Sequence, residues 1–191
     1  GVPTTLTHDK AGYLDISPVD LGENARRDMV LNLEDMGMEI ESSHHETAPA
    51  QHEIDFRCDE IRKMADHIMT FKMAVRTIAK RHGLHATFMP KPKVDANGSG
   101  MHIRFSLFKE GRNIFVDPEN PQELSENAYY FVGGLLAHSR EMAVITNPVV
   151  NSYKRLVPGY EAPTELTWTT NNQNSLIRIP GARGEHTGIE L

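Results

Sequence analysis

The sequence has few of the features that mark secreted, membrane-spanning or nucleic-acid-binding proteins. Its single cysteine among 191 residues, Cys58, excludes a disulfide within the chain and fits a reducing cytoplasm. No apolar run approaches the length of a membrane span, and residues 1–20 do not show the charged-then-apolar pattern of a signal peptide. The formal net charge of -6 argues against a nucleic-acid surface, which needs a concentrated basic patch. We therefore expect a globular, cytoplasmic protein that binds neither membrane nor nucleic acid.

The chain does contain amphipathic helices interspersed with short strands. Hydrophobic residues make up 39% of it, enough for the core of one domain. Apolar residues at helical spacing predict helices over residues 24–36, 59–81 and 124–142. Short alternating segments predict strands at residues 38–42, 52–56, 85–89, 101–107, 166–169, 175–179 and 187–191. Residues 1–19 read as an irregular arm and 151–163 as a loop, so the pattern favours a mixed α+β domain.

One stretch, residues 43–56, concentrates acids and imidazoles. Glu46 and Glu53 stand on either side of a bend that Pro49 and its small neighbours predict. Two carboxylates beside three histidines suit a hard divalent cation, whereas a polar turn with solvated glutamates is the alternative. Carboxylates brought this close repel each other, so we expect at least one of them to have a raised pKa.

The strand predicted over residues 101–107 follows a glycine-containing turn that lets backbone approach a ligand closely. Alternation assigns one face to His102, Arg104 and Ser106. The inward face is assigned to Met101, Ile103, Phe105 and Leu107. Taken alone His102 is a structural histidine, but beside the two glutamates it becomes a candidate metal ligand.

Four motifs, in this order, closely resemble those of type I glutamine synthetases. They are His44-His45-Glu46 with Gln51-His52-Glu53, then Asn97-Gly98-Ser99-Gly100-Met101-His102, then residues 151–163, then Leu176-Ile177-Arg178-Ile179-Pro180. The resemblance runs through essentially the whole chain and covers less than half of the family's length. It implies the family's catalytic domain, with a curved, mainly antiparallel sheet and helices packed on its outer side. It also implies ATP-dependent ligation of ammonia to glutamate through a γ-glutamyl phosphate, with Mg²⁺ or Mn²⁺ bridging the nucleotide phosphates.

The same resemblance implies roles for particular residues. Four would be metal ligands: Glu46 and Glu53 for the cation nearer glutamate, and His102 and Glu190 for the cation nearer ATP. Three would bind the substrate glutamate: Asn97, Gly98 and Arg155. Two stand at nucleotide-binding positions: Arg104 and Ser106. Two would be catalytic: Glu161, which closes the site and takes a proton from ammonium, and Arg178, near the transferring phosphate.

Three positions depart from the family pattern. Gln173 and Gly188 stand where the family has arginine, and Arg104 stands where it usually has histidine. Preorganised positive charge is commonly the largest catalytic contribution when a phosphoryl group moves. The two lost arginines therefore favour a catalytically inactive relative, unless Arg104 restores one charge in a different place.

The family pattern extends beyond this sequence. It includes an N-terminal β-grasp domain, a first strand with two further metal glutamates, and a C-terminal part, so we expect residues 1–191 to be a partial catalytic domain that is inactive alone. The family assembles as two stacked hexameric rings, which predicts a homo-oligomer. Two alternatives stay open: a γ-glutamyl ligase acting on another amine, and an inactive relative that binds nucleotide or metal or only assembles with active subunits. Intact Glu161 favours ammonia.

Overall fold

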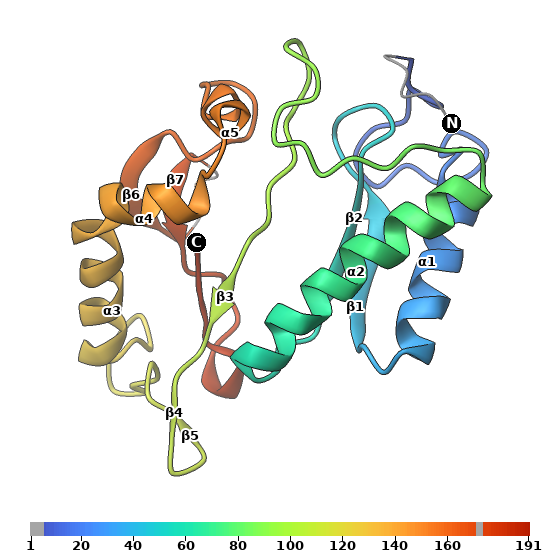
Figure 1. Ribbon diagram of the computed structural model, residues 1–191. Helices are drawn as coiled ribbons and strands as arrows, with labels where there is room; N and C mark the ends of the chain where they lie inside the picture. The colour runs from blue at the N-terminus through green and yellow to red at the C-terminus, as the bar shows by residue number, and fades with distance from the viewer. Residues whose placement is uncertain (1–5, 171–173) are drawn as a thin grey trace. The chain divides into compact units, whose positions relative to one another are not determined.

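The computed structural model describes residues 6–170 and 174–191, which divide into two compact units (Figure 1). Unit 1 contains the chain up to Met89 together with residues 93–97, and unit 2 contains residues 90–92 and 98–191. Among the described residues, no helix has the length and apolar character needed to cross a membrane.

Unit 1 is a β-hairpin covered by two helices. Strands β1 (Ile40–His45) and β2 (His52–Phe56) pair in antiparallel fashion. Helices α1 (Glu23–Asp35) and α2 (Ile61–Arg81) lie beside this hairpin in Figure 1. Both helices confirm the predicted ones to within two residues at either end, and β1 starts two residues later than expected and runs on to His45.

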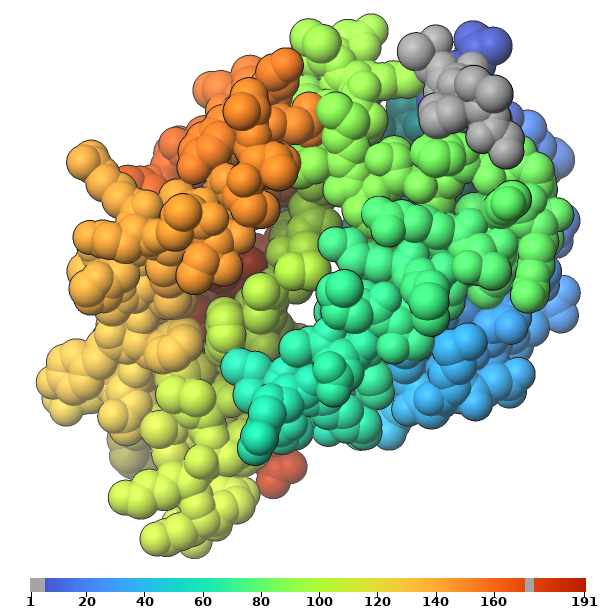
Figure 2. Space-filling model, in the orientation of Figure 1, coloured from blue at the N-terminus to red at the C-terminus, as the bar shows by residue number. Residues whose placement is uncertain are grey.

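The core of unit 1 forms where the apolar stripes of α1 and α2 meet the hairpin. From the helices it buries Ala25, Met29, Leu33, Ala74, Val75, Ile78 and Ala79. Ile54 and Phe56 of β2 pack against these residues, and the Phe56 ring meets that of Phe71 edge-on at 5.0 Å. The opposite side of α2 lies on the visible surface of Figure 2 and exposes Met69 and Met73.

Unit 2 is built on a four-stranded sheet in the order β3-β8-β7-β6. The strands are β3 (Arg104–Phe105), β6 (Glu165–Thr169), β7 (Ser175–Arg178) and β8 (Ile189–Glu190). The pairs β3–β8 and β8–β7 are antiparallel and β6–β7 is parallel. A small hairpin of β4 (Phe108–Lys109) and β5 (Arg112–Asn113) follows β3. The mainly antiparallel sheet beside helices confirms the α+β class.

Helix α3 (Glu126–Ala137) covers one face of this sheet. Its Ala128 and Val132 share a core with Ile177 and Ile189. Because side chains alternate along a strand, Arg178 and Glu190 project from the opposite face. The apolar side chains of β7 and β8 are thus buried against α3, and the charged side chains lie on the other face of the sheet.

Several sequence expectations need correction. The helix predicted over residues 124–142 is two helices, α3 and α4 (Ser139–Thr146), separated at His138. A short helix, α5 (Val150–Arg155), begins the stretch expected to be a loop, and residues 85–89 form no strand. The strand predicted over residues 101–107 is only β3, and Met101, Ile103 and Leu107, predicted to face inward, are 60%, 40% and 40% exposed. Phe105 does pack inward, against Phe131 at 5.6 Å.

Candidate active site

The bend between β1 and β2 brings one imidazole and two carboxylates together. In the hairpin register His44 lies opposite Glu53, and Glu46 follows at the start of the bend. One ligand atom from each of these three residues lies within 4.8 Å of the other two. The bend itself is closed by a hydrogen bond from the Glu46 backbone N–H to the Gln51 carbonyl at 2.8 Å. This donor set and spacing fit a divalent cation.

The two carboxyl groups of this cluster have different pKa values. Burial, together with hydrogen bonds to Asp55 and Glu46 and their negative charge, raises the pKa of Glu53 to about 8. Burial also disfavours ionised Glu46, but the Thr47 backbone N–H, the hydrogen bond with Glu53 and the nearby His44 outweigh it and lower the pKa of Glu46. The sequence led us to expect a raised pKa on at least one of the two glutamates, and Glu53 has it, with burial as the largest cause.

The other two histidines of the stretch face a different network. The His45 ring is fully buried, with Nδ1 2.6 Å from the Glu46 carbonyl oxygen and Nε2 3.1 Å from a carboxylate oxygen of Asp9. The same Asp9 oxygen accepts a hydrogen bond from the Ala50 backbone N–H at 2.8 Å. Asp9 therefore ties the N-terminal arm to both ends of the bend that carries Glu46.

An arginine lies inside this second network. Arg26 Nη1 donates to Asp20 Oδ2 at 2.8 Å and lies 2.8 Å from His52 Nδ1, and Arg26 Nε donates to Ser43 at 3.0 Å. A further set of possible ligand atoms occurs here, on Asp9, Asp20, His45 and His52. The guanidinium among them repels a cation and already satisfies its neighbours, so we assign this cluster a structural role.

The sequence did not point to Asp9, Asp20 or Arg26, because all three lie in segments without a metal-like spacing. Alternation along β1 was the available signal for the histidines. It sends His44 and His45 to opposite faces, so only one of them joins the glutamates.

In unit 2, one imidazole, one carboxylate and one guanidinium meet on the open face of the sheet. His102 Nδ1 lies 2.9 Å from Glu190 Oε1, and Arg178 Nη2 donates to the same oxygen. Arg178 and Glu190 are register partners on β7 and β8. Burial disfavours ionised Glu190, but the hydrogen bond from His102 and the charge of Arg178 outweigh it and lower the pKa of Glu190.

The two nucleotide-position residues contact the segment before β8. Arg104 is the register partner of Glu190, and its Nη2 donates to the His186 carbonyl at 2.5 Å. The Ser106 hydroxyl donates to the Thr187 carbonyl at 2.9 Å. Both side chains thus help to fix the backbone that leads to Glu190.

Arg155, at the end of α5, is cradled by two glycines. A Cβ placed on Gly98 would lie 2.9 Å from Arg155 Cγ, and one on Gly100 would lie 2.6 Å from Arg155 Nη2. Desolvation by burial lowers the pKa of Arg155, and its buried Nε has no hydrogen-bond partner among the described residues. The cradle is the close backbone approach expected of this turn.

The remaining predicted residues lie outside these clusters. Asn97 belongs to unit 1, and its neighbour Gly98 belongs to unit 2. Glu161 is exposed in the loop after α5 and has a left-handed backbone conformation, with φ of 49°. Gln173 lies outside the described residues. Gly188 is buried next to Arg104.

The predicted metal ligands therefore form two groups, one in each unit. Glu46 and Glu53 belong to unit 1, and His102 and Glu190 belong to unit 2. That all four line one cavity stays a prediction.

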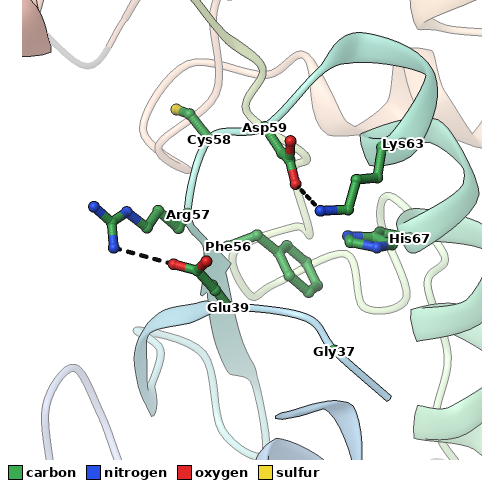
Figure 3. Close-up of a pocket in the computed structure, with 8 residues that line it drawn as sticks. All are labelled: Gly37, Glu39, Phe56, Arg57, Cys58, Asp59, Lys63 and His67. Carbon is green, nitrogen blue, oxygen red and sulfur yellow. Dashed lines mark hydrogen bonds and ion pairs between the residues drawn. The ribbon is translucent and has the colours of Figure 1, made fainter. Parts of the chain in front are cut away.

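A separate hollow in unit 1, shown in Figure 3, contains none of the predicted residues. It is lined by Gly37, Glu39, Phe56, Arg57, Cys58, Asp59, Lys63 and His67. Arg57 pairs with Glu39 at 3.0 Å, and Lys63 pairs with Asp59. Exposed pairs of this kind contribute little to stability, and the hollow brings together no set of groups suited to catalysis.

Comparison with known proteins identifies the family of the chain. The family model described as glutamine synthetase, catalytic domain, matches residues 2–191. The chain belongs to the glutamine synthetase catalytic-domain family. Glutamine synthetases from Clostridium saccharobutylicum and Thermus thermophilus are 60% and 57% identical to it over all 191 residues, which make up 43% of each relative. The chain thus spans less than half the length of the curated relatives it matches.

Solved structures of the family share the fold. A cryo-EM structure of Plasmodium falciparum glutamine synthetase aligns with a TM-score of 0.89 at 32% identity, over 95% of this chain and 36% of that one. A ligand-free structure of GmaS aligns with a TM-score of 0.82, also at 32% identity, over 94% of this chain and 41% of that one.

Proposed function

We propose that the protein containing this chain is a glutamine synthetase, which ligates ammonia to glutamate through a γ-glutamyl phosphate and yields glutamine, ADP and phosphate. The observation that carries the proposal is the cluster of His44, Glu46 and Glu53, found in a chain of this family. A structural turn has no need of two repelling carboxylates, one with a pKa of about 8.

In this proposal, divalent cations are held by Glu46 and Glu53 in unit 1 and by His102 and Glu190 in unit 2. Mg²⁺ or Mn²⁺ would offset negative charge on the ATP phosphates as the phosphoryl group moves. The structure supports the fit in unit 1 because carboxylate and imidazole atoms converge within 4.8 Å. In unit 2, the hydrogen bond from His102 and the charge of Arg178 favour the ionised form of Glu190, which a metal ligand requires, and a cation would take the place of Arg178 beside this carboxylate.

Arginines would handle the anionic groups of the substrates. Arg155 has a planar guanidinium, a buried Nε without a partner and two glycines beside it, which suits a carboxylate such as that of glutamate held near Gly98 and Asn97. Arg178 and Arg104 lie on the open face of the sheet, where they would meet phosphate oxygens. Ser106 stands on the same strand segment as Arg104.

The ammonia step is assigned to Glu161. Its carboxylate is exposed on a loop, where it can take a proton from ammonium when the loop closes over the site. Closure would also exclude water, which otherwise hydrolyses an acyl phosphate. We further propose a cytoplasmic homo-oligomer of two hexameric rings, which native mass spectrometry of the complete protein tests directly.

The deciding experiment measures glutamine and ADP formation by the complete protein with ATP, glutamate and Mg²⁺. Ammonia is compared with a panel of primary amines, and E53Q is compared with E41Q, which alters an exposed glutamate on β1. We expect turnover with ammonia that E53Q abolishes and E41Q retains. Turnover with another amine and not with ammonia would show that ammonia is not the substrate. Nucleotide binding without turnover would show that the protein is not an active ligase.

A further inference from the structure

Two of the three positions that depart from the family pattern touch each other. Arg104 of β3 extends over the backbone of Gly188, the residue before β8. A Cβ on residue 188 would lie 2.6 Å from Arg104 Nε and 2.8 Å from its Cγ, closer than such contacts occur in proteins. Any side chain at position 188 would thus displace Arg104.

The backbone of Gly188 does not itself call for glycine. Five described glycines have positive φ angles, and Gly188 is not among them. What requires glycine here is the space that the arginine occupies.

Side-chain donors hold this arrangement in place. Arg104 Nη2 donates to the His186 carbonyl at 2.5 Å, while Ser106 and Asn113 donate to the Thr187 carbonyl at 2.9 and 2.8 Å. The backbone on which the guanidinium rests is therefore anchored on both sides. A half-buried arginine with a fixed support loses little conformational entropy when it binds a ligand.

The charge of Arg104 is not neutralised by an ion pair with a carboxylate of the described residues. Among the described residues, no carboxylate forms an ion pair with Arg104, whereas Glu190, its register partner, is paired with Arg178 and His102. The open face of the sheet thus carries one acid and two arginines in neighbouring register positions on β7, β8 and β3. That excess of positive charge suits an anion such as phosphate.

We propose that Gly188 is the positioning residue for Arg104, and that Arg104 is a phosphate-binding arginine of this chain in addition to Arg178. The inference rests on the proposed nucleotide-binding function. The two departures are then one change: the positive charge that the family has at position 188, just before β8, is placed on the neighbouring strand β3 at Arg104. Arginine restored at position 188 alone would collide with Arg104 and would not repair the site.

The test is a double-mutant cycle in the complete protein, with the Kd of ATP–Mg²⁺ measured by calorimetry. We expect G188A to weaken binding about tenfold, the value of one charge-assisted hydrogen bond, and R104A to weaken it by at least as much. The double variant R104A/G188A should bind no more weakly than R104A, because the glycine acts only through the arginine. G181A is the control, since nothing lies within 4 Å of a Cβ at that exposed position.

A second comparison uses the family's own residues. G188R alone should bind ATP–Mg²⁺ more weakly than the parent, whereas R104H/G188R should regain affinity. The Tm of each variant is measured alongside, so that a loss of binding is separated from a loss of folded protein. Additive losses in the cycle, or parent-like binding by both G188A and G188R, would overturn the proposal.

Failure of the proposed function would look different. If the parent bound no nucleotide, the assignment of Arg104 to phosphate would fall together with that function. Crystal structures of the parent and G188A would still decide the positioning step. Arg104 lying against residue 188 in both, or in neither, would overturn it.

Discussion

A carboxyl group with a pKa of about 8 beside a second carboxylate weakens a folded protein, and Glu53 is such a group. Nothing in unit 1 demands this arrangement for folding, because Ile54 and Phe56 supply the hairpin's apolar contacts. Unfavourable electrostatics of this kind are concentrated at functional sites. At the scale of single residues, the unfavourable electrostatic energy of placing Glu46 beside Glu53 is therefore the strongest indication that the pair has a function.

We expect E53Q to leave the Tm of the metal-free protein unchanged or higher, because one of the two repelling carboxylates is removed. The rise in Tm on adding Mn²⁺ should be smaller than in the parent, since a cation at about 100 times its Kd for this site stabilises the parent by about 2.7 kcal/mol, while the site proposed at His102 and Glu190 is unchanged. Thermal unfolding with and without Mn²⁺ measures both effects, with E41Q as control. An equal Mn²⁺ shift in E53Q and the parent would remove Glu53 from the site.

The ion pair between Asp20 and Arg26 predicts a pH dependence of stability. Burial disfavours ionised Asp20, but the hydrogen bond and charge of Arg26 outweigh it and lower the pKa of Asp20 below 3.8. The folded state thus holds the ionised form more strongly than the unfolded chain does. The stabilisation is present above the unfolded pKa and is lost as the pH falls through the lower folded pKa.

We therefore expect D20N to lower the free energy of unfolding by about 3 kcal/mol at neutral pH, because it leaves buried Arg26 without its charged partner. The difference from the parent should narrow as the pH is taken below about 3.9, where Asp20 of the unfolded chain begins to be protonated, and should be lost as the pH falls through the lower pKa of folded Asp20. Urea unfolding of D20N and the parent, from neutral pH to below about 3.9, measures this difference in the free energy of unfolding. E39Q, which breaks an exposed pair with Arg57, should differ little at any pH, and a pH-independent loss in D20N would contradict the assignment.

At the scale of elements, α3 depends on a serine that acts twice. The Ser125 hydroxyl accepts a hydrogen bond from the Ala128 backbone N–H at 3.3 Å and donates to the Ile114 carbonyl at 2.6 Å. We expect S125A to cost about 1 to 2 kcal/mol, for the lost cap and the unpaired carbonyl. Urea unfolding checks this, with S139A at the start of α4 as a milder comparison. No loss in S125A would show that α3 is held by its apolar contacts alone.

The elements that the sequence predicted well are those whose pattern is strong over many residues. The apolar stripe of α2 and the apolar–polar alternation of β2 predict both the type of element and which side chains face the core. The alternation of β2 correctly placed Glu53 on the face opposite to Ile54 and Phe56. The sequence failed where tertiary contacts decide the structure. The helix break at His138 follows two helix-weakening glycines, Gly133 and Gly134, whose effect depends on packing.

Site prediction has the same limit. The resemblance pointed to Glu46, Glu53, His102 and Glu190 as metal ligands because they lie in recognisable stretches, and that assignment stays a proposal. Contacts between distant segments, such as Asp9 with Ala50 or Arg104 with Gly188, leave no local pattern. The sequence therefore marked Gly188 as a lost charge, and only the packing relates it to Arg104.

At the scale of the whole molecule, large apolar side chains remain exposed. Val144 and Ile145 of α4 and Val150 of α5 are 73%, 79% and 80% exposed, in a chain that spans 43% of its curated relatives. Exposed apolar surface of this kind is typical of protein interfaces. We expect the 191-residue chain, produced by itself, to self-associate and to form no glutamine, whereas the complete protein is active. Light scattering and a product assay on both test this, and robust turnover by the shorter chain would contradict it.

The contacts of Asp9 have a consequence for motion. Its carboxylate accepts from the Ala50 amide and pairs with His45, which in turn contacts the Glu46 carbonyl. The arm and the bend therefore cannot open separately without breaking buried hydrogen bonds, and they form one cooperative opening unit. In hydrogen exchange, the Ala50 amide should exchange at the rate at which the arm detaches. A cation bound at Glu46 and Glu53 should slow exchange in both segments alike.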